Sequence, residues 1–152
     1  MKNSFYCSTL LLIVLVICSF GKNISNMPPT PSDTPKPSYY GEWTVHKFIG
    51  STPISTAVDD SIIGMKATYT KEKASFDKDK ILNPEYNELE ITDDDFLKEY
   101  RNQLSDIGIN SKSVKTVKIN NWMNPGSFLI IKDEQTMIIL WNGNYFEMKK
   151  ET

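Results

Sequence analysis

The chain has 152 residues, of which 39% are hydrophobic, and its 17 basic and 19 acidic side chains give a net charge of −2. This length allows one domain with appendages. The composition excludes a disordered chain and a multi-pass membrane protein, and the charge balance excludes a generally basic nucleic-acid binder.

Residues 1–21 are predicted to direct export. A single lysine precedes an uncharged and largely apolar run, Asn3–Gly21, which ends in small residues. This pattern is typical of a signal peptide cleaved after Gly21. Two alternatives stay open: Leu15–Cys18 resembles a bacterial lipobox, which would make Cys18 a lipidation site, and the whole run is long enough to remain as one membrane anchor. The predicted location is therefore extracytoplasmic, either secreted or anchored through the N-terminus.

Residues 22–40 are predicted to form a proline-rich linker without a core of their own. The segment has few apolar side chains and contains five prolines, namely Pro28, Pro29, Pro31, Pro35 and Pro37. Proline fits neither a helix interior nor a sheet ladder. Two interpretations remain: an extended spacer that holds the domain away from a membrane, or a disordered leader.

Residues 41–152 are predicted to be the folded domain. In its first strand, 41–50, Trp43, Val45 and Ile49 share one face because alternate residues of a strand point the same way. Apolar residues then repeat at spacings of four, four and three over 54–65, which predicts a short amphipathic helix. Two short strands follow, over 67–70 and 74–77, and residues 77–80 are expected to turn.

A second helix is predicted over 93–107. Thr92 is a suitable N-cap, the acidic residues Asp93–Asp95 suit the first turn, and Gly108 suits the C-terminal stop. An extended piece over 86–91 precedes it.

The C-terminal third is predicted to be all strand. The runs 128–131 and 137–141 are continuously apolar, which predicts that both of their faces are covered. Asn142-Gly143 between Trp141 and Tyr145 is a strong hairpin signal. The predicted fold class is α+β, a mostly antiparallel barrel-like sheet of about seven or eight strands with two inserted helices.

Gly41-Glu42-Trp43, at the start of a domain that ends in consecutive hairpins, resembles the Gly-x-Trp opening of lipocalin-like (calycin) barrels. The resemblance implies that Trp43 closes one end of a small barrel and that a basic residue of the last strand, Lys149 or Lys150, lies across it. It further implies an apolar interior that admits a small ligand. The wider pattern is similar to small exported proteins of Gram-positive bacteria.

Six aromatic residues fall on predicted inward or central strands and are our predicted ligand-binding residues: Trp43, Tyr69, Phe76, Phe128, Trp141 and Phe146. Aromatic side chains commonly line ligand pockets. The alternative is that they fill a barrel too narrow to hold a ligand.

Trp122 and Met123 lie in a predicted loop rich in Asn, Pro and Gly. Large apolar side chains on a loop favour a partner-binding tip. The alternative is that Trp122 folds back as a lid on the barrel end.

Residues for catalysis and metal binding are sparse, so we predict no enzymatic activity, no metal and no cofactor. His46 is the one histidine, whereas zinc sites combine several His or Cys ligands. Helix capping accounts for Asp93–Asp95. The carboxylates Glu88, Glu90, Asp93 and Asp95 leave a hydrolase with a carboxylate pair as a third hypothesis.

The leading functional hypothesis is an exported, non-enzymatic binding module that holds a small apolar ligand at the cell surface. The alternative is a secreted inhibitor or protein-interaction domain that uses the Trp122-Met123 loop.

Overall fold

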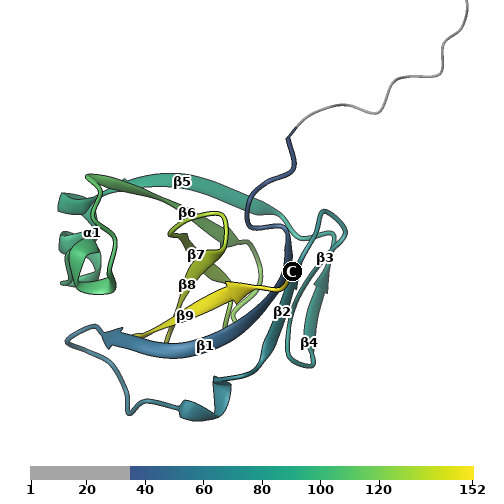
Figure 1. The fold of residues 1–152 in the computed structure, drawn as a ribbon, viewed down its shortest axis with the longest axis horizontal. Coiled ribbons are helices and arrows are strands. Elements are labelled where there is room, and N and C mark those ends of the chain that lie inside the picture. The colour runs from purple at the N-terminus through teal and green to yellow at the C-terminus, as the bar shows by residue number, and fades with distance from the viewer. Residues whose placement is uncertain (1–34) are drawn as a thin grey trace, which may run out of the picture. The chain divides into compact units, whose positions relative to one another are not determined.

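The computed structural model describes residues 35–152; the predicted signal or anchor with Cys18 and the linker up to residue 34 lie outside the described residues. Residues 35–152 form one antiparallel sheet that curls into a half-barrel and carries one α-helix, α1 (Asp93–Tyr100) (Figure 1). The nine strands of this sheet are β1 (Gly41–Ser51), β2 (Lys66–Tyr69), β3 (Lys73–Phe76), β4 (Asp79–Leu82), β5 (Tyr86–Thr92), β6 (Ser113–Ile119), β7 (Phe128–Ile131), β8 (Thr136–Trp141) and β9 (Asn144–Lys150). The predicted fold class is confirmed, with one more strand and shorter helices than expected.

The strand order β4-β3-β2-β1-β9-β8-β7-β6-β5 joins two meanders through the pairing of the first strand with the last. Strand β1 is long enough to pair with both β2 and β9. Its register against β9 shifts between Val45 and Lys47 and again between Phe48 and Gly50. Such bulges bend a strand, and the bends help the sheet to curl. Strands β4 and β5 are left at the two edges.

The curl brings the start of β5 against the segment that precedes β1. The Tyr86 ring lies 5.1 Å from the Tyr39 ring and 5.4 Å from the Tyr40 ring, measured between centroids. The Tyr86 hydroxyl donates to the Thr70 carbonyl oxygen at 2.8 Å. Tyr39 is buried. The end of the predicted linker therefore packs as part of the domain.

Strands β7, β8 and β9 contribute side chains to two cores on opposite faces of the sheet. The inner core contains Leu129, Met137, Ile139, Phe146 and Met148, whereas the outer core contains the alternating residues Ile130, Ile138 and Tyr145. This arrangement confirms the prediction that the two continuous apolar runs are covered on both faces. Phe146 and Met148 point inward, as predicted, and the hairpin turn lies at Asn142 and Gly143, both with positive φ.

The predicted helix over 54–65 is wrong, because only a single 3-10 turn forms there, over Asp60–Ile62. Backbone N–H groups of Thr52 and Thr56 donate to the carbonyls of Gly143 and Asn142, at 2.7 and 3.0 Å. These bonds hold the segment extended along the β8–β9 turn.

The predicted helix over 93–107 is confirmed in its first half only. Helix α1 begins at the Thr92 cap, as predicted, and ends because Arg101 takes a left-handed conformation with φ 60°. The Asp93 carboxylate accepts the Leu104 N–H at 2.6 Å, which starts a separate 3-10 turn over Leu104–Ile107. The predicted turn over 77–80 is shorter than expected, because Asp77 takes φ 51° and β4 begins at Asp79.

Candidate functional site

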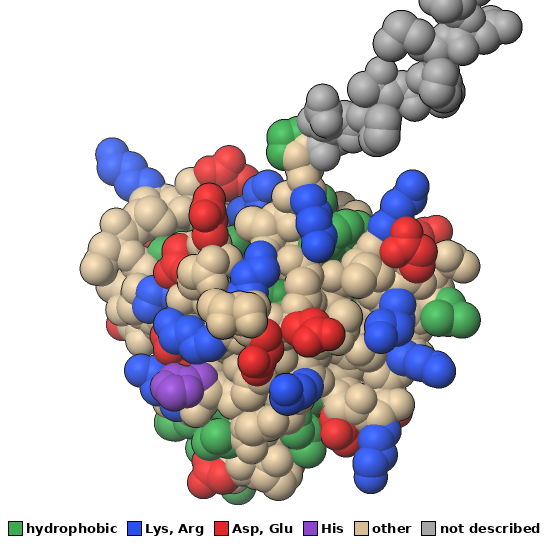
Figure 2. Space-filling model, turned by 45° about the vertical axis from the view of Figure 1, so that its right-hand side comes forward, with side chains coloured by type: hydrophobic (Ala, Val, Ile, Leu, Met, Phe, Trp, Pro, Cys, Tyr) green, Lys and Arg blue, Asp and Glu red, His purple; other side chains and the backbone are tan. Residues whose placement is uncertain are grey.

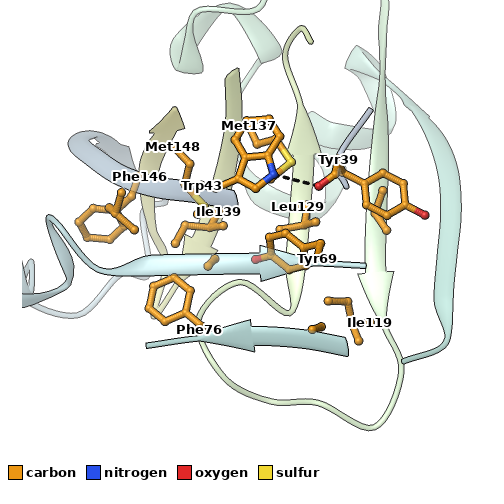
Figure 3. Close-up of a cluster of buried hydrophobic side chains, with 14 of the residues drawn as sticks. Tyr39, Trp43, Tyr69, Phe76, Ile119, Leu129, Met137, Ile139, Phe146 and Met148 are labelled. Carbon is orange, nitrogen blue, oxygen red and sulfur yellow. Dashed lines mark hydrogen bonds between the residues drawn. The ribbon is translucent and has the colours of Figure 1, made fainter. Parts of the chain in front are cut away.

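The inner core is built from large side chains that fill it. Trp43, Tyr69, Phe76 and Phe146, four of the six predicted ligand-binding aromatics, are buried in this core (Figure 3). The Tyr69 hydroxyl donates to the Gly126 carbonyl oxygen at 3.0 Å within the core. These four side chains therefore pack as structural residues.

Trp43 is fully buried in the inner core and is hydrogen-bonded to the segment that precedes β1. Its indole N–H donates to the Tyr39 carbonyl oxygen at 2.9 Å, and the Lys150 ammonium lies 5.2 Å from its ring centroid. Lys150 also donates to the Ser38 carbonyl at 2.8 Å. Of the two lysines that the calycin resemblance suggested, Lys150 is the one across the tryptophan, at a distance suited to a cation–π contact.

The other two predicted ligand-binding aromatics lie apart from these four. Trp141 is half-buried at the margin of the inner core. Phe128 points to the opposite face and packs against the outer core. The six residues therefore do not line one common pocket.

The outer core is covered by α1 and the following 3-10 turn. Phe96 is the buried residue of α1, and its ring lies 4.7 Å from the Tyr100 ring and 6.2 Å from the Tyr145 ring. The 3-10 turn adds Leu104 and Ile107. One short helix and one turn are too small to cover the whole outer face of β5, β6, β7 and β8.

The uncovered part of this face is a groove of about 650 Å³ between α1 and the sheet. We call it the α1 groove. Its apolar floor consists of Leu89, Ile91, Tyr100, Phe128 and Leu140. Leu89 remains 58% exposed on the outer face of β5, opposite Thr116 of β6. Two smaller hollows, lined among others by Tyr40 and Lys150 and by Asp94 and Lys112, do not include Trp43.

The rim of the α1 groove is mostly acidic. The side chains of Asp95 and Glu99 on α1 line it together with one basic residue, Lys118. Hydrogen bonding by the Thr92 hydroxyl, with help from Lys98, lowers the pKa of Asp95, so this carboxylate stays charged. An apolar floor with a negative rim suits a ligand that has an apolar body and a cationic group.

The predicted Trp122-Met123 tip separates into two roles. Trp122 folds back and packs, half-buried, against the inner core. Met123 points away and is 86% exposed. One residue of the pair thus packs on the inner core and the other presents an apolar side chain to solvent.

Residues considered for metal binding or catalysis lie on the surface. His46 is exposed on β1. Figure 2 shows basic and acidic side chains interspersed over one face of the domain. Glu88 accepts hydrogen bonds from the Tyr39 hydroxyl and from Lys115, and the Tyr39 bond lowers its pKa. Within residues 35–152 no group of three or more His, Cys, Asp or Glu side chains is placed to hold a metal ion.

Sequence reasoning did not identify the α1 groove. Leu89 lies between Glu88 and Glu90, a pattern typical of an ordinary amphipathic strand. Only the path of α1 in the structure shows that the apolar side of β5 is left uncovered.

Comparisons of the chain with protein-family models, with curated proteins and with solved structures found no match. In the part that the structure describes, no helix has the length and apolar character needed to span a bilayer.

Proposed function

We propose that the domain is a non-enzymatic binding module whose α1 groove takes an amphipathic ligand with an apolar body and a cationic group. One observation carries the proposal: Leu89 is 58% exposed on the apolar floor of a groove that the carboxylates of Asp95 and Glu99 also line. The groove volume lies within the usual range of ligand sites, roughly 300–1,000 Å³. The tight packing of Trp43, Tyr69 and Phe146 supports this groove over the barrel interior as the place for the ligand.

The compartment and the ancestry belong to the same proposal. Export to the cell surface, with or without lipidation of Cys18, is supported by the uncharged run Asn3–Gly21. A relationship to lipocalin-like barrels is supported by the curled sheet and by Lys150 over Trp43. In this proposal the outer face has taken over the binding role.

The proposal is tested with two probes of equal chain length and opposite charge, dodecylamine and dodecanoate, below their critical micelle concentrations. We expect calorimetry to give at least about tenfold tighter binding of the amine, equivalent to about 1.4 kcal/mol. In methyl NMR spectra the amine should shift the signals of Leu89, Ile91 and Leu140. Equal binding of both probes, or shifts confined to the inner-core methionines, would contradict the proposal.

A matched pair of leucine variants localises the site. Leu89→Arg places a cation on the groove floor and should weaken dodecylamine binding by at least about tenfold. Leu82 is 65% exposed on β4 and does not line the groove, so Leu82→Arg is the control and should bind like the parent chain. Both leucines are largely exposed, so neither change should alter folding.

The alternative function, a protein-interaction domain, is favoured by one observation, the 86% exposure of Met123 on its loop. In that case a protein partner would shift the Met123 methyl signal and leave Leu89 unchanged. Met123→Glu would then abolish binding of the partner without affecting dodecylamine.

A further inference from the structure

Strand β5 presents an unpaired backbone edge. Asp93 donates its N–H to the Lys112 carbonyl and Asn120 donates to the Glu85 carbonyl, at 2.9 and 3.0 Å. In an antiparallel ladder, every second residue of a strand directs its backbone N–H and C=O groups at the partner strand. In β5 these are the odd-numbered residues, whose backbone groups bond to β6. The N–H and C=O groups of Glu88 and Glu90 therefore point away from the sheet. Within the described residues β5 has no second neighbouring strand.

This edge lies in the most acidic part of the chain. Residues 85–99 contain seven acidic side chains and one lysine, a net charge of −6, whereas the whole chain has −2. The remaining residues therefore carry +4. A negative field of this size beside free backbone groups attracts a basic partner and speeds its association.

The two faces of β5 differ in chemistry. Glu88 and Glu90 point to the face shared with Val117 and Lys115, whereas Leu89 and Ile91 point to the α1 groove. Side chains of an added strand would alternate in the same way, about 4.8 Å from β5. A peptide whose lysines or arginines lie opposite Glu88 and Glu90 would place its alternate residues beside Leu89 and Ile91.

We propose that the β5 edge binds an extended peptide of alternating basic and apolar residues, which adds to the sheet as an antiparallel strand over Glu88–Thr92. The inference rests on the proposed function, because the apolar residues of the peptide occupy the side of the α1 groove next to Leu89. Main-chain hydrogen bonds provide affinity, and alternate side chains provide specificity.

A second copy of this chain fits the edge poorly. Antiparallel pairing of β5 with itself about Leu89 places Glu88 of one copy opposite Glu90 of the other. Like charges directly opposite one another destabilise a strand pair. A basic partner reverses the sign of this interaction at both positions.

The probe is the peptide acetyl-Lys-Ile-Lys-Val-Lys-Ile-Lys-amide, with the peptide in which glutamate replaces every lysine as the charge control. Two N-methylated forms test the pairing. With the valine opposite Leu89, the lysines on either side of it lie opposite Glu88 and Glu90 and direct their N–H groups at β5, so N-methylation of the lysine that precedes the valine blocks the pairing. N-methylation of the valine alters the solvent edge instead and is the matched control.

We expect the lysine peptide and its valine-methylated form to bind, and the lysine-methylated and glutamate forms to bind at least about tenfold more weakly. Amide exchange of Glu88 and Glu90 should slow by at least about tenfold with the peptide, whereas the ladder amides of Leu89 and Ile91 are protected from the start. Glu88→Pro removes an edge N–H without touching the β5–β6 ladder, and should weaken the peptide further than Glu88→Gln does.

The outcomes separate this inference from the proposed function. If dodecylamine binds and is lost in Leu89→Arg but the peptide leaves the Glu88 and Glu90 amides unprotected, the edge inference is wrong and the groove proposal stands. If neither probe binds, both fail. Protection of these amides that rises with protein concentration alone would instead show self-pairing and overturn the basic-peptide inference.

Discussion

The two cores share the strands β7, β8 and β9 and differ in how they are covered. The inner core is enclosed by the curl of the sheet itself, with Trp43 and Lys150 at one end. The outer core is covered by the eight-residue helix α1 and a four-residue 3-10 turn. In the inner core, which the sheet encloses, the large side chains pack against one another. On the outer face, the short helix leaves the α1 groove uncovered. The incompletely covered outer face is where the described residues leave an open groove, and this is the face that our proposed function uses.

Trp43→Ala should have the largest effect on the enclosed core. The indole is fully buried and its N–H is hydrogen-bonded to Tyr39, so we expect a loss of about 3–5 kcal/mol in the free energy of unfolding. Urea unfolding monitored by circular dichroism measures this loss. A loss below about 1 kcal/mol would show that the sheet does not enclose a packed interior. At a temperature where the variant stays folded, dodecylamine binding should persist.

Phe96→Ala should act on the other face and affect both properties. Phe96 is the buried anchor of α1, so we expect a loss of about 3 kcal/mol together with loss of dodecylamine binding. Leu97, exposed on the same helix, provides the control, because Leu97→Ala should change stability by less than about 0.5 kcal/mol. Retained binding in Phe96→Ala would place the ligand site outside the α1 groove.

Trp122→Ala and Met123→Ala compare neighbours that differ in burial. Trp122 packs half-buried on the inner core, so its removal should cost about 1.5 kcal/mol. Met123 is 86% exposed, and its removal should cost less than about 0.5 kcal/mol. Thermal unfolding of the two variants side by side measures the difference. Equal losses of stability in the two variants would contradict the packing of Trp122 on the inner core.

Tyr69→Phe and Tyr145→Phe compare one buried hydroxyl from each core. The Tyr69 hydroxyl donates to the Gly126 carbonyl, so its removal should cost about 1 kcal/mol. Within the described residues the buried Tyr145 hydroxyl has no hydrogen-bond partner, so Tyr145→Phe should leave stability unchanged or raise it by about 1 kcal/mol. Denaturant midpoints decide the comparison. A larger loss in Tyr145→Phe than in Tyr69→Phe would reverse it.

Local sequence signals predicted the elements whose causes are local. Asn142-Gly143 takes the two positive φ angles of a tight hairpin, and the Thr92 cap begins α1 where expected. The continuous runs of β7 and β8 predicted coverage of both faces correctly, because a strand with no polar side has to be buried on both.

The features that the sequence missed depend on distant contacts. Residues 54–65 have the spacing of a helix, but their backbone bonds to the Asn142–Gly143 turn keep them extended and leave Ile54 90% exposed. Helix α1 ends where Arg101 takes a left-handed conformation, and the Asp93 carboxylate accepts the Leu104 N–H of the next turn, 11 residues along the chain. The α1 groove exists because the helix stops there, so no local pattern around Leu89 indicates that its apolar side lacks a cover.

A last and smaller effect concerns pH and only the inner side of β5. The Tyr39 hydroxyl, donating at 2.8 Å, is the largest cause that lowers the pKa of Glu88 below its ordinary value of 4.5. A carboxylate whose pKa is lower in the folded state stabilises the fold above the unfolded pKa, and this contribution disappears as the pH falls through the folded pKa. Glu88→Gln should therefore be less stable than the parent near neutral pH, by less than about 1 kcal/mol because the carboxylate is largely exposed. The difference should disappear once the pH falls below the lowered pKa of Glu88 in the folded protein. Tyr39→Phe removes this hydrogen bond and should reduce the same pH dependence of stability. If the stability difference between Glu88→Gln and the parent instead grows as the pH falls, the Tyr39 contact does not favour the charged form of Glu88.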